Sequence, residues 1–190
     1  MSPSRPLALA LLLVCTACKP PASDDYVSRM TLTRQAETFA SDPLPSPDAK
    51  GAVWAAGAQP LRILYGVPGK MPFLAIRCDT STEVPRIDFT RFSPADREAK
   101  AIMALIGNGH VERFEVTARN NGRAWLWEGG QAADSAELDV LTGSHDVELT
   151  IPGAGSLMLH PSPLPGKLID ACSDLTQIVQ SPEASTSPPG

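Results

Sequence analysis

The stretch that decides the fold is Ala101-Ile-Met-Ala-Leu-Ile-Gly-Asn-Gly-His-Val-Glu-Arg-Phe-Glu-Val-Thr-Ala-Arg-Asn-Asn-Gly-Arg-Ala-Trp-Leu-Trp127. Asn108-Gly109 is a strong signal for a tight β-hairpin, because both residues tolerate a positive φ. Asn120-Asn121-Gly122 marks a second turn. The two turns separate three apolar segments, which we predict to form an antiparallel meander: Ala101–Ile106, His110–Ala118 and Ala124–Trp127.

The middle segment of this meander alternates between apolar and polar residues, which is typical of a strand with one buried face. We expect Phe114, Val116 and Ala118 to point into the core. The intervening residues are then on the solvent face: Arg113, Glu115 and Thr117.

Further short apolar segments with turn signals between them surround the meander. We predict strands at Leu61–Tyr65, Phe73–Cys78, Arg86–Arg91 (with Ile87 and Phe89 on one face), Val147–Ile151 and Ser156–His160, a short helix at Asp134–Thr142 closed by Gly143, and a final strand or turn at Leu168–Cys172. This pattern predicts a mainly β fold, either an antiparallel β-sandwich or a small barrel, with one short helix.

Proline-rich flanks bracket this β domain. The chain has 190 residues and 19 prolines, and the prolines cluster at its two ends. We predict a signal peptide over residues 1–17, a tether over 18–50, the antiparallel β domain over 51–176 and a disordered tail over 177–190.

The N-terminus has the features of an export signal. Arg5 provides a basic n-region, and Leu7–Val14 is an apolar run too short to span a bilayer as a helix. Thr16-Ala17 before Cys18 resembles the lipobox of bacterial lipoproteins, in which that cysteine is lipidated and becomes the mature N-terminus. Cys15 fits less well, because bulky Val14 precedes it, and ordinary cleavage after Ala17 would leave Cys18 first without a lipid. Lys19 after Cys18 resembles outer-membrane rather than inner-membrane sorting.

Charge and composition argue against several classes of partner. The net charge is −5, and removal of Arg5 with the leader leaves 15 basic groups against 21 acidic ones, a charge of −6. A mildly acidic chain lacks the basic footprint of a nucleic-acid-binding protein. A local basic stretch is predicted to be a solvated sheet edge: Arg86, Arg91, Arg97 and Lys100.

Two cysteines remain for the folded domain. Cys15 leaves with the signal peptide and Cys18 becomes the N-terminus, so Cys78 and Cys172 are left. In an oxidising envelope two such cysteines are expected to pair. The alternative, a reactive thiol, lacks a histidine or second cysteine nearby in sequence, although Arg77 precedes Cys78.

The residues Ile76-Arg77-Cys78-Asp79, the segment Ser135–Gly143 followed by Val147–Pro152, and Leu168-Ile-Asp-Ala-Cys172 resemble a group of small proteobacterial envelope lipoproteins. The resemblance covers about Trp54–Cys172. In that group two cysteines bracket a β domain, which implies the same fold and disulfide here. No activity is established for the group, so the resemblance implies no catalytic residues.

Residues with catalytic or metal-binding potential form no motif in the sequence. His110, His145 and His160 are far apart, without metal-ligand spacing, so we predict no metal, no cofactor and no catalytic residue. Trp125 and Trp127 share one face of their strand. We favour a core role for both, and the alternative is that Leu126 points inward and both indoles form a contact surface for a protein or glycan.

The sequence therefore predicts a membrane-anchored lipoprotein that faces the periplasm, held by its N-terminal lipid. We expect a non-enzymatic binding or inhibitor module with an envelope protein or cell-wall glycan as its partner, since a tethered anchor favours a binder. One alternative is a structural or assembly lipoprotein of an envelope complex that pairs through an edge strand. The other is a hydrolase, which requires a pocket that gathers a histidine and a carboxylate.

Overall fold

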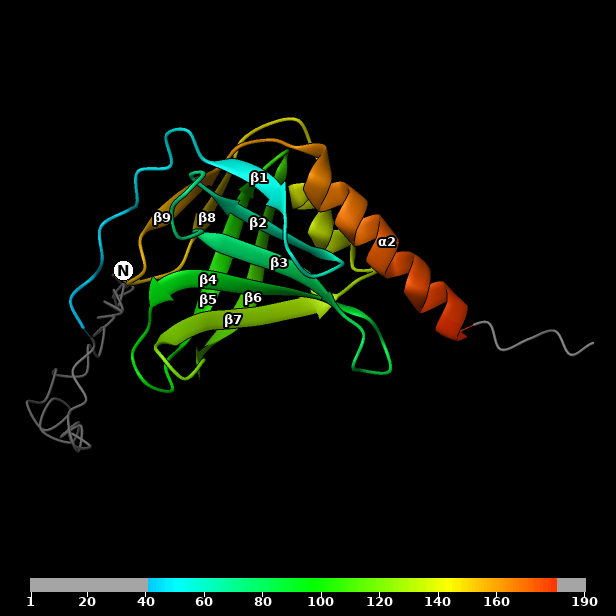
Figure 1. Cartoon of the computed structure of the whole chain (residues 1–190), viewed down its shortest axis with the longest axis horizontal. Helices are drawn as coiled ribbons and strands as arrows, with labels where there is room; N and C mark the ends of the chain where they lie inside the picture. The colour runs from blue at the N-terminus through cyan, green and yellow to red at the C-terminus, as the bar shows by residue number, and fades with distance from the viewer. Residues whose placement is uncertain (1–40, 181–190) are drawn as a thin grey trace, which may run out of the picture. The chain divides into compact units, whose positions relative to one another are not determined.

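The computed structural model describes residues 41–180, which form a single antiparallel sheet of nine strands with two helical segments (Figure 1). The predicted signal peptide, Cys18, most of the tether and residues 181–190 lie outside the described residues. In chain order the elements are β1 Val53–Ala56, β2 Arg62–Gly66, β3 Leu74–Asp79, β4 Arg86–Pro94, β5 Lys100–Gly107, β6 His110–Asn120, β7 Trp125–Ala132, the 3-10 helix η1 Ala136–Leu141, β8 Val147–Thr150, β9 Ser156–Leu159 and the helix α2 Pro163–Gln180.

The strand order β1-β2-β3-β4-β7-β6-β5-β8-β9 confirms the predicted mainly β antiparallel fold. The sheet is curled into a half-barrel, which corresponds to the barrel alternative rather than to two packed sheets. The predicted meander is present as β5, β6 and β7. Asn108 and Gly109 both have positive φ in the β5–β6 turn, as the hairpin prediction requires.

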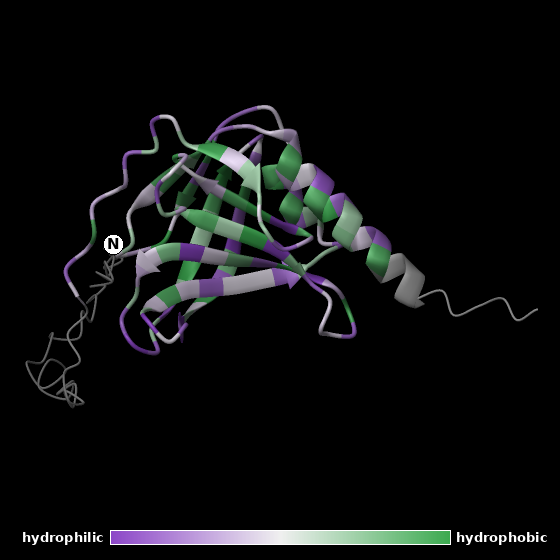
Figure 2. Ribbon diagram, in the orientation of Figure 1, coloured by the Kyte–Doolittle hydropathy of each residue, from purple (hydrophilic) through white to green (hydrophobic). Residues whose placement is uncertain are grey.

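The core lies on the inner face of the curl, and alternation along each strand explains how it forms. Figure 2 shows hydrophobic and hydrophilic residues alternating along β4. Ile87 and Phe89 are buried on its inner face, and Phe114 of β6 packs with its ring centroid 5.5 Å from that of Phe89. Val116 and Ala118 are also buried, so the inward residues of β6 are those predicted.

The two edges of the sheet meet along a seam made by side chains. Tyr65 of β2 donates its hydroxyl to the Met158 carbonyl at 2.9 Å and accepts from the His160 amide at 3.1 Å. Trp54 Nε1, from the β1 strand that sequence analysis did not predict, donates to the His160 carbonyl at 2.9 Å. These bonds satisfy backbone groups that an edge strand otherwise exposes to pairing with another chain.

The last ten residues of the predicted tether lie on the domain. The Leu44 amide donates to the Gly153 carbonyl at 2.9 Å, and Ser46 Oγ accepts from the Ser156 amide at 2.9 Å. Residues within the predicted tether therefore contact the β domain through these two hydrogen bonds. Proline restricts the backbone of residues 41–50, so their remaining backbone and side-chain polar groups can bond to the adjacent β8–β9 hairpin.

The helical content differs from the prediction in two ways. The predicted short helix is the 3-10 helix η1, and Ser135 Oγ caps it by accepting from the Glu137 amide. The predicted final strand or turn at Leu168–Cys172 is wrong, because these residues belong to α2. Ser162 Oγ accepts from the Leu164 amide at 3.2 Å, and a proline follows this capping serine, which is a strong helix start. Helix α2 also extends to Gln180, past the predicted start of the tail at residue 177.

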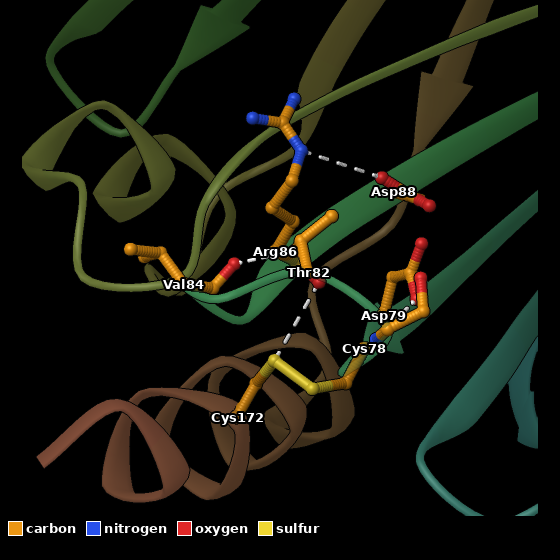
Figure 3. Close-up of a disulfide and its surroundings, with 8 residues drawn as sticks. Cys78, Asp79, Thr82, Val84, Arg86, Asp88 and Cys172 are labelled. Carbon is orange, nitrogen blue, oxygen red and sulfur yellow. Dashed lines mark hydrogen bonds and ion pairs between the residues drawn. A yellow bond between two sulfur atoms is a disulfide. The ribbon is translucent and has the colours of Figure 1, made fainter. Parts of the chain in front are cut away.

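Helix α2 packs against the inner face of the sheet and is bonded to it covalently. Leu168, Ile169 and Cys172 belong to the core. Cys172 forms the predicted disulfide with Cys78 of β3, with a Cα–Cα distance of 5.6 Å (Figure 3). The pairing follows from the fold, because the helix places Cys172 directly beneath the end of β3. Within residues 41–180, no helix meets the length and hydrophobicity that crossing a membrane requires.

Candidate functional site

A hollow of about 620 Å³ lies on the outer face of the sheet, across β2, β3, β4, β7 and β6. We call it the charged hollow, because four arginines and three carboxylates line it. Its charged residues are Arg62, Arg77, Arg86, Asp88, Glu115, Arg119 and Glu128. They occupy the outward positions that alternate with the core residues of the same strands.

The end of the hollow on β2, β3 and β4 is basic. The strand register places Arg62 opposite Arg77, and Arg77 opposite Asp88. Arg77 Nη2 lies 3.0 Å from Asp88 Oδ2. Arg86 Nε lies 4.0 Å from Asp88 Oδ1, a pair that Figure 3 shows. Arg77 also reaches Asp79 at the rim, at 3.5 Å. Two of the three arginines at this end therefore converge on one carboxylate.

Burial and hydrogen bonding act oppositely on the two acids near Arg77. Partial burial raises the pKa of Asp88, and the hydrogen bond from Arg77 works against that rise. The pKa of Asp79 is lowered, mainly by hydrogen bonds from the backbone and side chain of Ser81. Asp88 is thus the less readily ionised of the two, and its charge depends on Arg77 and Arg86.

Arg62 forms no ion pair among the described residues. Its Nε is buried and has no hydrogen-bond partner among the described residues, and its Nη1 makes a 3.4 Å bond to Gln59 Oε1. Like charges directly opposite each other on neighbouring strands are destabilising. The Arg62–Arg77 pair is therefore a place where an added anion would lower the energy.

The end of the hollow on β7 and β6 is acidic. Glu128 of β7 lies opposite Thr90 of β4 and Thr117 of β6, so two hydroxyl side chains flank it. Glu115 and Arg119 project from β6 on the same face. Neither glutamate forms an ion pair with another residue of the range 41–180. The hollow is thus polarised, with cations in excess at one end and carboxylates in excess at the other.

Two adjacent glycines line the hollow, and of these Gly130 leaves it open, because a Cβ on Gly129 would instead meet the Glu115 carbonyl oxygen and the core residue Val116. Gly129 and Gly130 line it at the point where the β6–β7 ladder ends, after the Glu128–Thr117 pair. A Cβ on Gly130 would overlap with the Asp88 carboxylate and lie 2.8 Å from the Ile87 carbonyl oxygen. The backbone carbonyl of Gly130 accepts from Arg86 Nη2 at 2.7 Å. The absence of a side chain at this position leaves room for both Asp88 and Arg86.

The two tryptophans considered as a contact surface are not a solvent-exposed pair. Trp127 is 7% exposed and belongs to the core, which agrees with the favoured interpretation and excludes it as a surface residue. Trp125 is half-buried, and the Arg97 guanidinium lies 6.0 Å from its ring centroid. The basic stretch is not entirely a solvated edge either, because Arg91 is buried on the inner face.

The histidines lie outside the charged hollow. His160 Nδ1 is 3.0 Å from Asp146 Oδ1, and His160 also lines a second depression of about 530 Å³ with Glu148 and residues 46–51. His160 is therefore paired with a carboxylate, Asp146, which is not among the residues that line the depression. Across the described part of the chain, no three side chains of the metal-binding types gather in one place.

Sequence reasoning missed the charged hollow, because its residues come from five strands and meet only through the register. The one available signal was the outward position of charged residues in alternating segments, which is equally typical of a solvated face. Comparisons with protein-family models, with curated proteins and with solved structures find no match to this chain.

Proposed function

We propose that this protein is a lipid-anchored, non-enzymatic binding module of the bacterial cell envelope and that the charged hollow is its ligand site. The observation that carries the proposal is the polarised hollow itself. It offers arginines and carboxylates that other side chains leave partly uncompensated, on the outer face of a nine-stranded sheet. Charged groups held on strands are precise recognition elements.

The envelope location rests on the N-terminus and on the sulfur chemistry. The lipobox-like Thr16-Ala17-Cys18 supplies the anchor, and the Cys78–Cys172 disulfide is of the kind that persists in oxidising compartments. Between Cys18 and Ser41, the first residue that the structure describes, lie 22 residues. A lipid on Cys18 would concentrate the domain at a membrane surface, which favours a binding role there.

Binding is favoured over chemistry because the charged hollow contains no histidine, cysteine or serine among its lining residues. Of its three carboxylates, Asp88 is already engaged by Arg77 and Arg86. A general base must be able to reach a proton of the substrate, whereas a paired carboxylate mainly fixes its arginines.

A hydrolase is the second candidate, and the His160–Asp146 pair beside the second depression favours it. A carboxylate on Nδ1 orients an imidazole so that Nε2 can act as a base. Substitution His160→Gln tests this candidate. If the protein hydrolyses a component of envelope extracts, the variant should lose that activity. If the protein is a binding module, the variant should still bind its partner.

Photo-crosslinking in living cells tests the binding proposal. A photoreactive residue at Thr117, inside the hollow, is expected to capture an envelope component from the lipidated protein. The same residue at Lys70, in the exposed β2–β3 turn, is the matched control and should capture much less. Equal capture from both positions would remove the hollow as the ligand site. A mature protein found in the cytosol with an uncut leader and free thiols at Cys78 and Cys172 would remove the envelope location.

A further inference from the structure

We infer that the charged hollow takes a short zwitterionic peptide segment, with a carboxylate at the end on β2 and β3 and an ammonium at the end on β7 and β6. This inference rests on the proposed function and adds the chemical class of the ligand. It follows from the charges at the two ends, from the distance between them and from the volume of the hollow.

The basic end calls for a carboxylate. Arg62 and Arg77 face each other across neighbouring strands, and the buried Nε of Arg62 has no partner among the described residues. Asp88 is shared between Arg77 and Arg86 and does not form an ion pair with Arg62 within the described chain. A carboxylate can accept charge-assisted N–H bonds from a guanidinium, and Arg62 lines the hollow without an ion pair among the described residues.

The acidic end calls for a cation. Glu128 and Glu115 lie on the outward face of adjacent strands, and Arg119 balances at most one of them. The hydroxyls of Thr90 and Thr117 flank Glu128. An ammonium group has three donors, which matches one carboxylate and two hydroxyl acceptors.

The distance between the two ends selects a short ligand. Arg62 and Glu128 are separated by three strand spacings and by one side-chain repeat along the strand, which together amount to about 16 Å between backbone positions. An extended tripeptide spans about 10 Å, and the arginine and glutamate side chains can close the remainder. The hollow, at about 620 Å³, has room for such a segment over Gly129 and Gly130.

A uniformly anionic polymer fits less well. Its charges would meet Glu115 and Glu128 after leaving the arginines, and like charges repel across a low-dielectric surface. The whole chain also carries a net charge of −5. The polarised arrangement selects for a ligand that carries both signs of charge.

Titration of the detergent-solubilised, disulfide-bonded chain with the tripeptide Ala-Ala-Ala tests the inference. Calorimetry measures the affinity, and NMR shifts of the Gly129 and Gly130 amides report its location. We expect N-acetylation or C-terminal amidation of the tripeptide to weaken binding at least tenfold each, because each cap removes one charge. A doubly capped tripeptide should not shift these two amides.

Variants of the protein link each end of the hollow to one end of the ligand. Glu128→Gln should weaken binding of the free tripeptide tenfold and leave the N-acetylated one unaffected. Arg62→Gln should weaken binding of the free tripeptide tenfold and leave binding of the C-amidated tripeptide unaffected. Arg113→Gln and Glu98→Gln, at exposed positions outside the hollow, are the matched controls and should change nothing.

Three results would overturn the inference: no shift of the glycine amides at millimolar tripeptide, affinity that is indifferent to N-acetylation, or acetate alone binding as tightly as the tripeptide. If any of these occurs while crosslinking from Thr117 still captures an envelope component, the ligand class is wrong and the proposed function stands. If crosslinking from Thr117 also fails, both the ligand class and the proposed binding function are wrong.

Discussion

Arg91 shows how much a single residue can oppose the stability of this core. It is 3% exposed, and Nη1 donates to the Phe73 carbonyl at 3.0 Å, while Nε has no partner among the described residues. Burial lowers the pKa of Arg91 to about 10. Its cross-strand neighbour Trp127 also has an unpartnered Nε1 within the described chain. A buried cation without a carboxylate costs free energy that well-packed apolar atoms would not.

We therefore expect Arg91→Met to raise the free energy of unfolding at pH 7 by about 1–3 kcal/mol. The Phe73 carbonyl would not be orphaned, because it also accepts from the Phe92 amide at 2.9 Å. Urea denaturation followed by tryptophan fluorescence measures the change. Arg91→Lys keeps the charge and serves as the control, which should not be stabilised. Equal destabilisation by both substitutions would mean that the charge has a compensating partner.

A second prediction for a single residue concerns the effect of Gly130 on stability. Gly130→Ala should lower the free energy of unfolding by about 1–3 kcal/mol, because the new Cβ meets the Ile87 backbone and the Asp88 carboxylate. Gly166→Ala is the contrasting case, since its Cβ would meet Thr142 at an ordinary 3.8 Å within α2. It should leave stability unchanged or raise it by up to about 1 kcal/mol. Thermal denaturation compares the two, and a neutral Gly130→Ala would show that the sheet yields easily there.

At the scale of elements, local patterns predicted the strands except β1 and failed for α2. Phe114 and Val116 were assigned to the inner face because alternation and turn chemistry are both written in consecutive residues. In contrast, Leu168–Cys172 is too short a window to distinguish a strand from a helix. The helical period becomes visible only when Leu164, Leu168 and Cys172 are read together after the Ser162 cap. The charged hollow was beyond reach, because strand register, not sequence proximity, brings Arg77 and Glu128 to one surface.

The hydrogen bonds of Tyr65 between β2 and the end of β9 lead to a prediction about stability. Tyr65→Phe should lower the free energy of unfolding by about 1–3 kcal/mol, because it leaves the Met158 carbonyl and the His160 amide without their partner. Burial raises the pKa of Tyr65, so the unfolded chain loses this proton before the folded chain does. The wild-type protein should therefore lose stability as the pH rises above about 10, and Tyr65→Phe should lose less over that interval. Chemical denaturation at pH 8 and pH 11 measures both effects, and a variant as pH-sensitive as the wild type would contradict the assignment.

For the whole molecule, the disulfide links helix α2 to the sheet, to which no strand pairing joins it. It joins β3, whose outward neighbours Arg77 and Asp79 belong to the basic end and rim of the hollow, to the helix that covers the core. Cys172 Sγ also lies 3.6 Å from the Arg86 carbonyl oxygen, which is a packing contact, since a disulfide sulfur has no proton to donate. The disulfide thus links α2, which contributes to the core, to β3, the strand that carries Arg77 of the hollow.

Removal of this bond should act mainly through the unfolded state. The bridge closes a sequence separation of 94 residues, which in the chain-entropy model stabilises the folded protein by about 4–5 kcal/mol, with 2–5 kcal/mol the usual loss on removal. We expect Cys78→Ala with Cys172→Ala to lower the free energy of unfolding by that amount and to steepen its dependence on urea, because the unfolded chain then exposes more surface. The wild-type protein treated with a reductant is the matched control and should behave in the same way. A double variant as stable as the oxidised protein would show that packing of α2 alone closes the half-barrel.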